Sequence, residues 1–130
     1  MHRTAIIIDD DPISVLVCET LLKKTAFAEE VICFENGDKA LDYFSDRYQR
    51  GEGLPDIIFL DVIMPVTDGW EFLEAYEALE KLPEKKPHIV MLSAAFDPQD
   101  KAKAEKSPLI TAFISKPITT DILTEMAEAS

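Results

Sequence analysis

The feature that most constrains this chain is an alternation between short apolar runs and longer amphipathic segments. The runs are brief, rich in Ile, Val and Phe, and apolar at successive positions, which is typical of strands buried on both faces of a sheet. There are five of them: Thr4–Ile8, Val31–Phe34, Ile57–Leu60, His88–Leu92 and Ala112–Ser115. Strict alternation of strand and helix predicts an α/β domain with one parallel sheet and helices on both of its faces.

Four of the intervening segments carry apolar residues at helical spacing. They follow Pro12, Asn36-Gly37-Asp38, Thr67-Asp68-Gly69 and Thr119-Thr120. The last of them predicts a helix over Asp121–Ala129, with Thr119 or Thr120 as its N-cap. Pro98–Lys106 is strongly polar, so we expect the fourth helix to be short or mobile. Gly51–Pro55 is predicted to be a loop.

Length and charge limit the classes of function. A chain of 130 residues with 47% apolar residues is expected to form one globular domain over residues 1–130. With 13 Lys and Arg against 25 Asp and Glu, the net charge of −12 opposes binding to nucleic acid or to an anionic membrane. No apolar run approaches the roughly 20 residues of a membrane-spanning helix, and the N-terminus does not resemble a signal peptide. We therefore expect a cytoplasmic protein without membrane insertion.

The cysteines and histidines give no sign of metal binding or nucleophilic catalysis. Cys18 and Cys33 lie in apolar stretches without metal-ligand spacing, and we expect both to be buried, reduced thiols. His2 and His88 have no Ser or Cys partner suggested by spacing, so neither is expected to be catalytic.

Polar residues follow four of the five predicted strands. They are Asp9, Asp10 and Asp11 after the first, Asp61 after the third, Ser93 after the fourth and Lys116 after the fifth. In parallel sheets of this kind the ligand site lies outside the carboxyl ends of the strands, where the strand order reverses. Converging carboxylates repel one another unless a cation neutralises them. Because Mg²⁺ prefers carboxylate and carbonyl oxygens and often completes its shell with a phosphoryl oxygen, the sequence predicts a Mg²⁺ site here.

The same residues suggest phosphoryl chemistry. Asp61 is the candidate nucleophile, because a carboxylate that is ionised at neutral pH needs no base to attack phosphorus. Lys116 could reach one phosphoryl oxygen, and the Ser93 hydroxyl could donate to another. Each feature is weak alone, since an acidic triplet before Pro12 is commonly a solvated turn at a helix N-terminus. The prediction depends on four strands delivering complementary groups to one edge.

These segments resemble the receiver domain of response regulators, the phosphoacceptor half of two-component signalling, over nearly the whole chain. The matching segments are IIIDDDP at 6–12, LDVIMPVTDG at 60–69, MLSA at 91–94 and FISKP at 113–117. The resemblance implies a flavodoxin-like (βα)₅ three-layer sandwich whose five-stranded parallel sheet has the order 2-1-3-4-5.

The resemblance also implies a metal site and a phosphorylation site. Asp61 would be phosphorylated, and Asp9 and Asp10 would be the family's acidic pair. Asp10, Asp61 and the backbone carbonyl of Ile63 would help to ligate Mg²⁺, and Asp11 would be a spectator.

Four further roles follow from the resemblance. Ser93 takes the position of the switch hydroxyl and Phe113 that of the switch aromatic, which rotates inward when the hydroxyl is drawn to the phosphoryl group. Lys116 would pair with the phosphoryl group and precede a cis bond to Pro117. Ala94 would leave the site accessible and offer a backbone N–H.

Two positions of the chain qualify the expected behaviour. In this family, two positions affect how readily water attacks the phosphorylated aspartate, and they are occupied here by Ile63 and Ala95. Neither side chain can orient a water molecule by hydrogen bonding. We therefore expect slow autodephosphorylation, which a phosphoryl half-life of only seconds with Mg²⁺ would contradict. Ser107–Ala112 replaces the family's usual Gly-Ala pair, a departure that concerns the fourth helix and its loop and not the chemistry.

The leading interpretation is a stand-alone receiver that signals by protein contact and is not an enzyme acting on a separate substrate. Its phosphodonor would be a histidine kinase or a histidine phosphotransfer protein, and homodimer formation is left open. One alternative is a Mg²⁺-dependent phosphohydrolase with the same Asp nucleophile, although Ile63 stands where such enzymes usually carry a second Asp. Another is a receiver-like interaction module that works without phosphorylation.

Overall fold

The strands form a single parallel sheet. The computed structural model describes residues 2–50, 55–64, 67–79, 87–94 and 97–129. The strands are β1 (His2–Ile8), β2 (Ala28–Phe34), β3 (Ile57–Asp61), β4 (His88–Ser93) and β5 (Ile110–Ser115). Their order is β2-β1-β3-β4-β5, and every neighbouring pair is parallel. The predicted fold class and strand order are confirmed.

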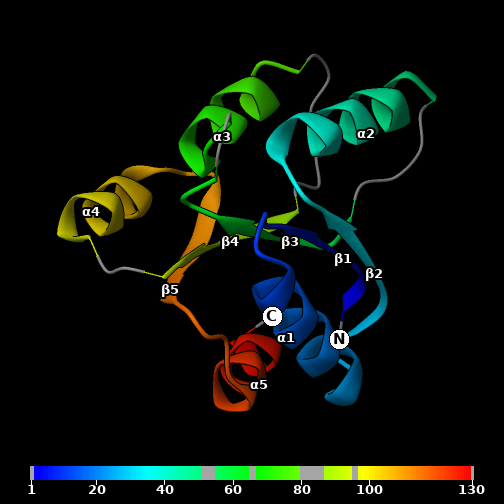
Figure 1. The fold of residues 1–130 in the computed structure, drawn as a ribbon, viewed down its shortest axis with the longest axis vertical. Coiled ribbons are helices and arrows are strands. Elements are labelled where there is room, and N and C mark those ends of the chain that lie inside the picture. The colour runs from blue at the N-terminus through cyan, green and yellow to red at the C-terminus, as the bar shows by residue number, and fades with distance from the viewer. Residues whose placement is uncertain (1, 51–54, 65–66, 80–86, 95–96, 130) are drawn as a thin grey trace.

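Helices cover both faces of this sheet. They are α1 (Pro12–Lys24), α2 (Gly37–Arg50), α3 (Gly69–Glu77), α4 (Pro98–Lys106) and α5 (Thr120–Ala129). Figure 1 shows α1 and α5 on one face of the sheet and α2, α3 and α4 on the other. None of the helices in the described part of the chain has the length and apolar character needed to cross a membrane. Of the predicted loop Gly51–Pro55, only Pro55 belongs to the described residues.

Side-chain caps fix where several helices begin. Asp11 caps α1 by accepting the N–H of Ile13 at 3.0 Å, with Pro12 in the first turn. The Thr119 hydroxyl accepts the N–H of Ile122 at 3.2 Å, so Thr119 rather than Thr120 is the N-cap of α5. Asp68 and Glu71 form a reciprocal capping box at the start of α3. Helix α1 therefore starts directly after the acidic residues that follow β1.

The three central strands are the most buried part of the molecule. All five residues of β3 are buried, and each face of the sheet packs against its own apolar layer. Phe44, Phe72 and Tyr76 form the aromatic centre of the layer under α2 and α3, with ring centroids 5.4 to 6.2 Å apart. Because burial of each such side chain contributes about 1.5–3 kcal/mol, this core holds the strand ends in fixed positions.

The expectation that all five strands are buried on both faces is wrong for β2 and β5. These are the edge strands of the sheet, and both are only partly buried. Cys33 of β2 is exposed, whereas Cys18 of α1 is buried at 3% exposure, so the expectation of a buried thiol holds only for Cys18. An edge strand has a neighbour on one side only, which leaves part of its surface in contact with water.

Helix α4 forms over the predicted range, but apolar burial contributes little to its attachment. Ala104 is its one buried residue. The Trp70 indole N–H of α3 donates to Asp100 Oδ1 of α4 at 3.0 Å, and Lys103 Nζ lies 4.4 Å from the centroid of the Trp70 ring. A hydrogen bond and a cation–π contact therefore link α4 to α3.

Between α4 and β5 the chain departs from the predicted strand boundary. Strand β5 begins at Ile110, two residues before the predicted start. Ile110 pairs with Ile89 and Ala112 pairs with Val90, so the register shifts by one residue at Thr111. An extra residue of this kind in one strand is a β-bulge, which a run of apolar residues does not reveal.

Candidate functional site

The polar residues predicted at the strand ends meet at one edge of the sheet. Asp9 follows β1 and Asp61 ends β3, and these two strands flank the point where the strand order reverses. Ser93 ends β4, and its backbone carbonyl accepts the N–H of Lys116 at 2.8 Å, just beyond β5. The peptide bond between Lys116 and Pro117 is cis, as the resemblance implied.

Lys116 lies between two buried carboxylates. Its Nζ is 2.8 Å from Asp9 Oδ2 and 3.4 Å from Asp61 Oδ1. The side chain of Lys116 is 13% exposed, that of Asp9 2% and that of Asp61 6%. One ammonium group is shared by two ionisable acids that water hardly reaches, so the buried part of the site retains excess negative charge.

The titration of these groups follows from their surroundings. Burial, followed by the negative charge of Asp9, raises the pKa of Asp61 to about 6, against an opposing effect of Lys116. Burial lowers the pKa of Lys116, but its contacts with Asp9 and Asp61 outweigh this, and the net shift is upward. Lys116 therefore stays charged at neutral pH while Asp61 holds its proton more tightly than an ordinary aspartate.

Three acids come close enough to share a cation. Asp9, Asp10 and Asp61 each offer one oxygen, and these oxygens lie within 4.8 Å of one another. Asp10 is exposed, so the cluster opens to solvent on one side. Ile63, two residues past Asp61, carries a side chain that is 65% exposed. Hard oxygen donors, excess negative charge and an open side fit a Mg²⁺ ion that keeps several of its waters.

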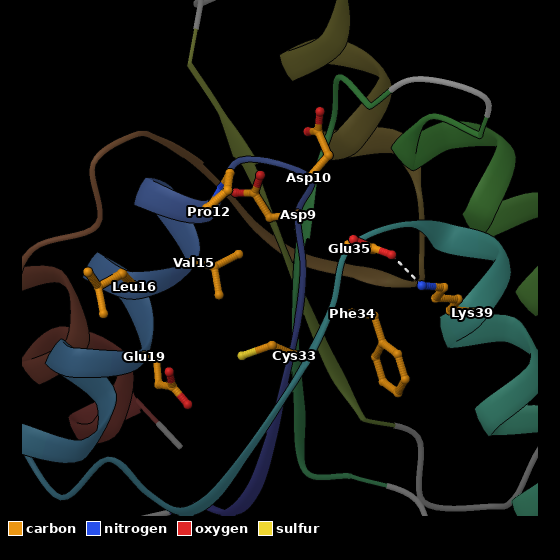
Figure 2. A pocket seen from close by; sticks show the side chains of 10 residues that line it. All are labelled: Asp9, Asp10, Pro12, Val15, Leu16, Glu19, Cys33, Phe34, Glu35 and Lys39. Atoms are coloured by element: carbon orange, nitrogen blue, oxygen red, sulfur yellow. Dashed lines mark hydrogen bonds and ion pairs between the residues drawn. The ribbon is translucent and has the colours of Figure 1, made fainter.

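A pocket leads away from the acid pair. Asp9 and Asp10 lie at one end of a pocket of about 530 Å³ between α1, β2 and the start of α2, and the Cys33 sulfur points across it toward α1 (Figure 2). Lys39 at its rim forms an ion pair with Glu35. Burial, with a smaller contribution from the charge of Glu19, raises the pKa of the Cys33 thiol. This upward shift favours the protonated thiol of Cys33 over the thiolate, which is the reactive form of cysteine.

The remaining predicted residues lie at the carboxyl end of β4 or within β5. Ser93 is buried at 1% exposure. Ala94 is exposed and, with Lys116, lines a second pocket of about 270 Å³. Phe113 is half-buried on β5 beside Met91 and lines a cavity of about 250 Å³ next to α4. Ala95, which was expected to affect attack by water, lies outside the described residues, so slow autodephosphorylation stays a prediction.

Two residues at the site were not predicted from the sequence. Ser14 Oγ lies 3.4 Å from Lys116 Nζ and donates to Asp11 Oδ2 at 3.0 Å. Gly69 packs closely against the backbone of Asp61. A Cβ at position 69 would lie only 2.6 Å from the Asp61 carbonyl oxygen, so a residue with a side chain does not fit there without a shift. The spacing of Asp11 and Ser14 within a first helical turn could have indicated the hydrogen bond between these two residues. Nothing local indicates the contact of Ser14 with Lys116 or that of Gly69 with Asp61.

We expect Gly69→Ala to destabilise the protein by about 2 kcal/mol, because the added methyl group forces the backbone after Asp61 to move. Gly37→Ala is the matched control. There the nearest atom is the flexible Thr67 methyl group at 3.2 Å, so a smaller loss is expected. Urea denaturation measures the free energy of unfolding of both variants. Equal losses in the two variants would contradict a special steric requirement for glycine at position 69.

Comparison with known proteins gives the same family throughout. The family model described as the response regulator receiver domain matches residues 5–128. A two-component response regulator, ORR1 of Oryza sativa subsp. japonica, is 29% identical over 96 residues, which are 72% of this chain and 41% of that protein. The hybrid signal transduction histidine kinase B of Dictyostelium discoideum is 32% identical over 131 aligned positions, covering 93% of this chain and 6% of that protein. The chain therefore spans less than half the length of these curated relatives.

Solved structures agree over nearly the full length. A two component response regulator from Cytophaga hutchinsonii is 30% identical with a TM-score of 0.89, covering 98% of this chain and 96% of that one. A response regulator receiver protein from Dyadobacter fermentans DSM 18053 is 30% identical with a TM-score of 0.80 at the same coverage. The family match over residues 5–128 and the shared fold show that this chain belongs to the response regulator receiver domain family.

Proposed function

We propose that this receiver domain takes a phosphoryl group onto Asp61 in a Mg²⁺-dependent reaction and changes its protein-binding surface in response. One observation carries the proposal: the buried Asp61 carboxylate lies beside Lys116 in an acidic cluster that opens to solvent through Asp10. The phosphodonor would be a histidine kinase or a histidine phosphotransfer protein. We place the activity in one domain over residues 1–130, in the cytoplasm, with no separate substrate turned over.

In this mechanism an Asp61 carboxylate oxygen attacks phosphorus, and the bond from phosphorus to the donor's imidazole nitrogen breaks. The product is an acyl phosphate on Asp61, and the imidazole leaves with the bonding electron pair. Asp9, Asp10, Asp61 and the Ile63 carbonyl would hold Mg²⁺, which when bound neutralises charge on the phosphoryl oxygens. Since the attacking group is already ionic, the protein has mainly to position it and balance charge.

Lys116, Ser93 and Ala94 would hold the transferred group. Lys116 is positioned over Asp61 by its contacts with two carboxylates and can pair with a phosphoryl oxygen. Ser93 would donate its hydroxyl hydrogen and Ala94 its backbone N–H to the remaining oxygens. Inward movement of Ser93 would allow Phe113 to turn, and the cavity of about 250 Å³ between Phe113 and α4 supports such a change. A partner that prefers one of the two states would then detect phosphorylation.

An apolar face next to the site supports delivery of the phosphoryl group by a protein. Ile13 is 73% exposed, Leu16 63% and Val17 39%, all on α1. An exposed apolar patch of this kind is typical of a protein-interaction surface. Because α1 begins directly after Asp9 and Asp10, a phosphodonor bound to this face would lie beside the phosphoacceptor.

The first test is intact mass after incubation with acetyl phosphate, with Mg²⁺ or with EDTA, on wild type and Asp61→Asn. We expect one phosphoryl adduct that requires both Mg²⁺ and Asp61. Release of phosphate with repeated turnover would favour the phosphohydrolase instead. No adduct under any condition would favour an interaction module that works without phosphorylation.

A further inference from the structure

The Lys116 ammonium group has a third neighbour besides the two acids. Ser14 Oγ lies 3.4 Å from Lys116 Nζ, the same distance as Asp61 Oδ1, whereas Asp9 Oδ2 is closer at 2.8 Å. Ser14 belongs to the first turn of α1, so this contact comes from a helix and not from a strand end. Among the described residues, the Lys116 ammonium group therefore contacts two acids and one neutral side chain.

The orientation of the Ser14 hydroxyl is fixed by Asp11. Ser14 donates its hydroxyl hydrogen to Asp11 Oδ2 at 3.0 Å, which leaves the oxygen lone pairs available to Lys116. Asp11 is itself held by the N–H of Ile13, and its own N–H donates to Asp9 Oδ1 at 2.9 Å. Asp11 is therefore more than a solvated acid, because it makes Ser14 an acceptor for Lys116.

We propose that Ser14 is a positioning residue that keeps the Lys116 ammonium group beside Asp61 when Asp9 helps to bind the metal ion. This inference rests on the proposed function. Asp9 makes the shortest contact with Lys116 and also belongs to the acidic cluster. Because two cations on one carboxylate repel each other, Lys116 must weaken its contact with Asp9 when a metal is held there. Ser14 is then the neutral acceptor that Lys116 retains.

The inference makes Mg²⁺ affinity depend on a residue that is not itself a metal ligand. Without the Ser14 hydroxyl, the two carboxylates are the side-chain partners left to Lys116 among the described residues, so it competes more strongly for Asp9. We expect Ser14→Ala to weaken Mg²⁺ binding about threefold, the size of effect of a modest hydrogen bond near solvent. We expect the rate of phosphorylation by acetyl phosphate at saturating Mg²⁺ to fall by a similar factor. Ser14→Thr, which keeps the hydroxyl, should restore both.

A matched control variant and a second genetic background distinguish positioning of Lys116 by Ser14 from a purely structural role of Ser14 at the start of α1. Thr20→Ala removes an exposed hydroxyl from the same helix, away from Lys116, and should leave Mg²⁺ affinity unchanged. In a Lys116→Met background, Ser14→Ala should also have no effect, because the group it positions is absent. The Lys116 Nζ resonance in ¹⁵N NMR gives a readout that needs no Lys116 substitution. We expect it to shift in Ser14→Ala with Mg²⁺ and not in Thr20→Ala.

The decisive measurement is titration calorimetry with Mg²⁺ on wild type, Ser14→Ala, Ser14→Thr and Thr20→Ala. A threefold loss confined to Ser14→Ala, together with the shifted Lys116 resonance, supports the inference. Equal affinities for wild type and Ser14→Ala, or the same loss in the Lys116→Met background, overturn it while the proposed function stands. Absence of Mg²⁺ binding by wild type would instead overturn the proposed function and this inference with it.

Discussion

Lys116→Met is expected to destabilise the metal-free protein by about 3 kcal/mol at pH 7.5, because it leaves Asp9 and Asp61 buried without their shared cation. Both acids are nearly inaccessible to water, with side chains 2% and 6% exposed. Urea denaturation in EDTA measures the loss. Methionine keeps a long apolar stem in place of the lysine, so lost packing contributes little to the difference.

Two comparisons test whether charge is the cause of this loss. Adding Asp61→Asn to Lys116→Met removes one of the two repelling acids and should recover most of the lost stability. Mg²⁺ should also stabilise Lys116→Met more than wild type, since no ammonium group then competes for Asp9. A loss below about 1 kcal/mol, or no recovery in the double variant, would contradict the role of Lys116 as the compensating charge.

Asp61→Asn alone is expected to stabilise the metal-free protein by about 2 to 3 kcal/mol at pH 7.5. The pKa of Asp61 is raised from 3.8 to about 6, mainly by burial and next by the charge of Asp9, with Lys116 opposing. A difference of about two pKa units between the folded and unfolded chain corresponds to roughly 3 kcal/mol. The amide of asparagine is uncharged at all pH values, so the variant avoids this cost.

The pH dependence has a definite sign. Between about pH 4 and pH 6 the folded protein binds the Asp61 proton more tightly than the unfolded chain does, so wild-type stability relative to Asp61→Asn falls as pH rises. The gain from Asp61→Asn should therefore be near zero at pH 4 and complete above about pH 6. Asp42→Asn, at an exposed position of α2, is the matched control. A gain from Asp61→Asn that is constant from pH 4 to pH 7.5 would refute the raised pKa.

Much of the site could be predicted from the sequence because it follows from the topology. Once five strands are known to be parallel, the residues after each strand must gather at one edge, which is how Asp9, Asp61 and Lys116 meet. The roles proposed for Asp61 and Lys116 in phosphoryl transfer followed from the chemistry of these residues and were also implied by the resemblance to receiver domains. The structure adds the contacts of Lys116 with Asp9 and Asp61.

The features that were not predicted depend on tertiary contacts, which local sequence patterns do not reveal. An apolar run does not reveal whether its strand is central or at an edge, so Cys33 was expected to be buried and is exposed. The Ser14 contact joins α1 to the residue after β5, and the close approach of Gly69 joins α3 to β3. Such contacts appear only when elements distant in sequence are assembled.

The link between α3 and α4 gives this protein an internal optical probe. Trp70 is the only tryptophan in the sequence, so all indole emission comes from the ring that contacts Asp100 and Lys103. Separation of the two helices would expose that ring to water and change its fluorescence. Any movement of α4 that accompanied the proposed phosphorylation could therefore be followed in the unlabelled protein, in real time, with Trp70→Phe as the blank.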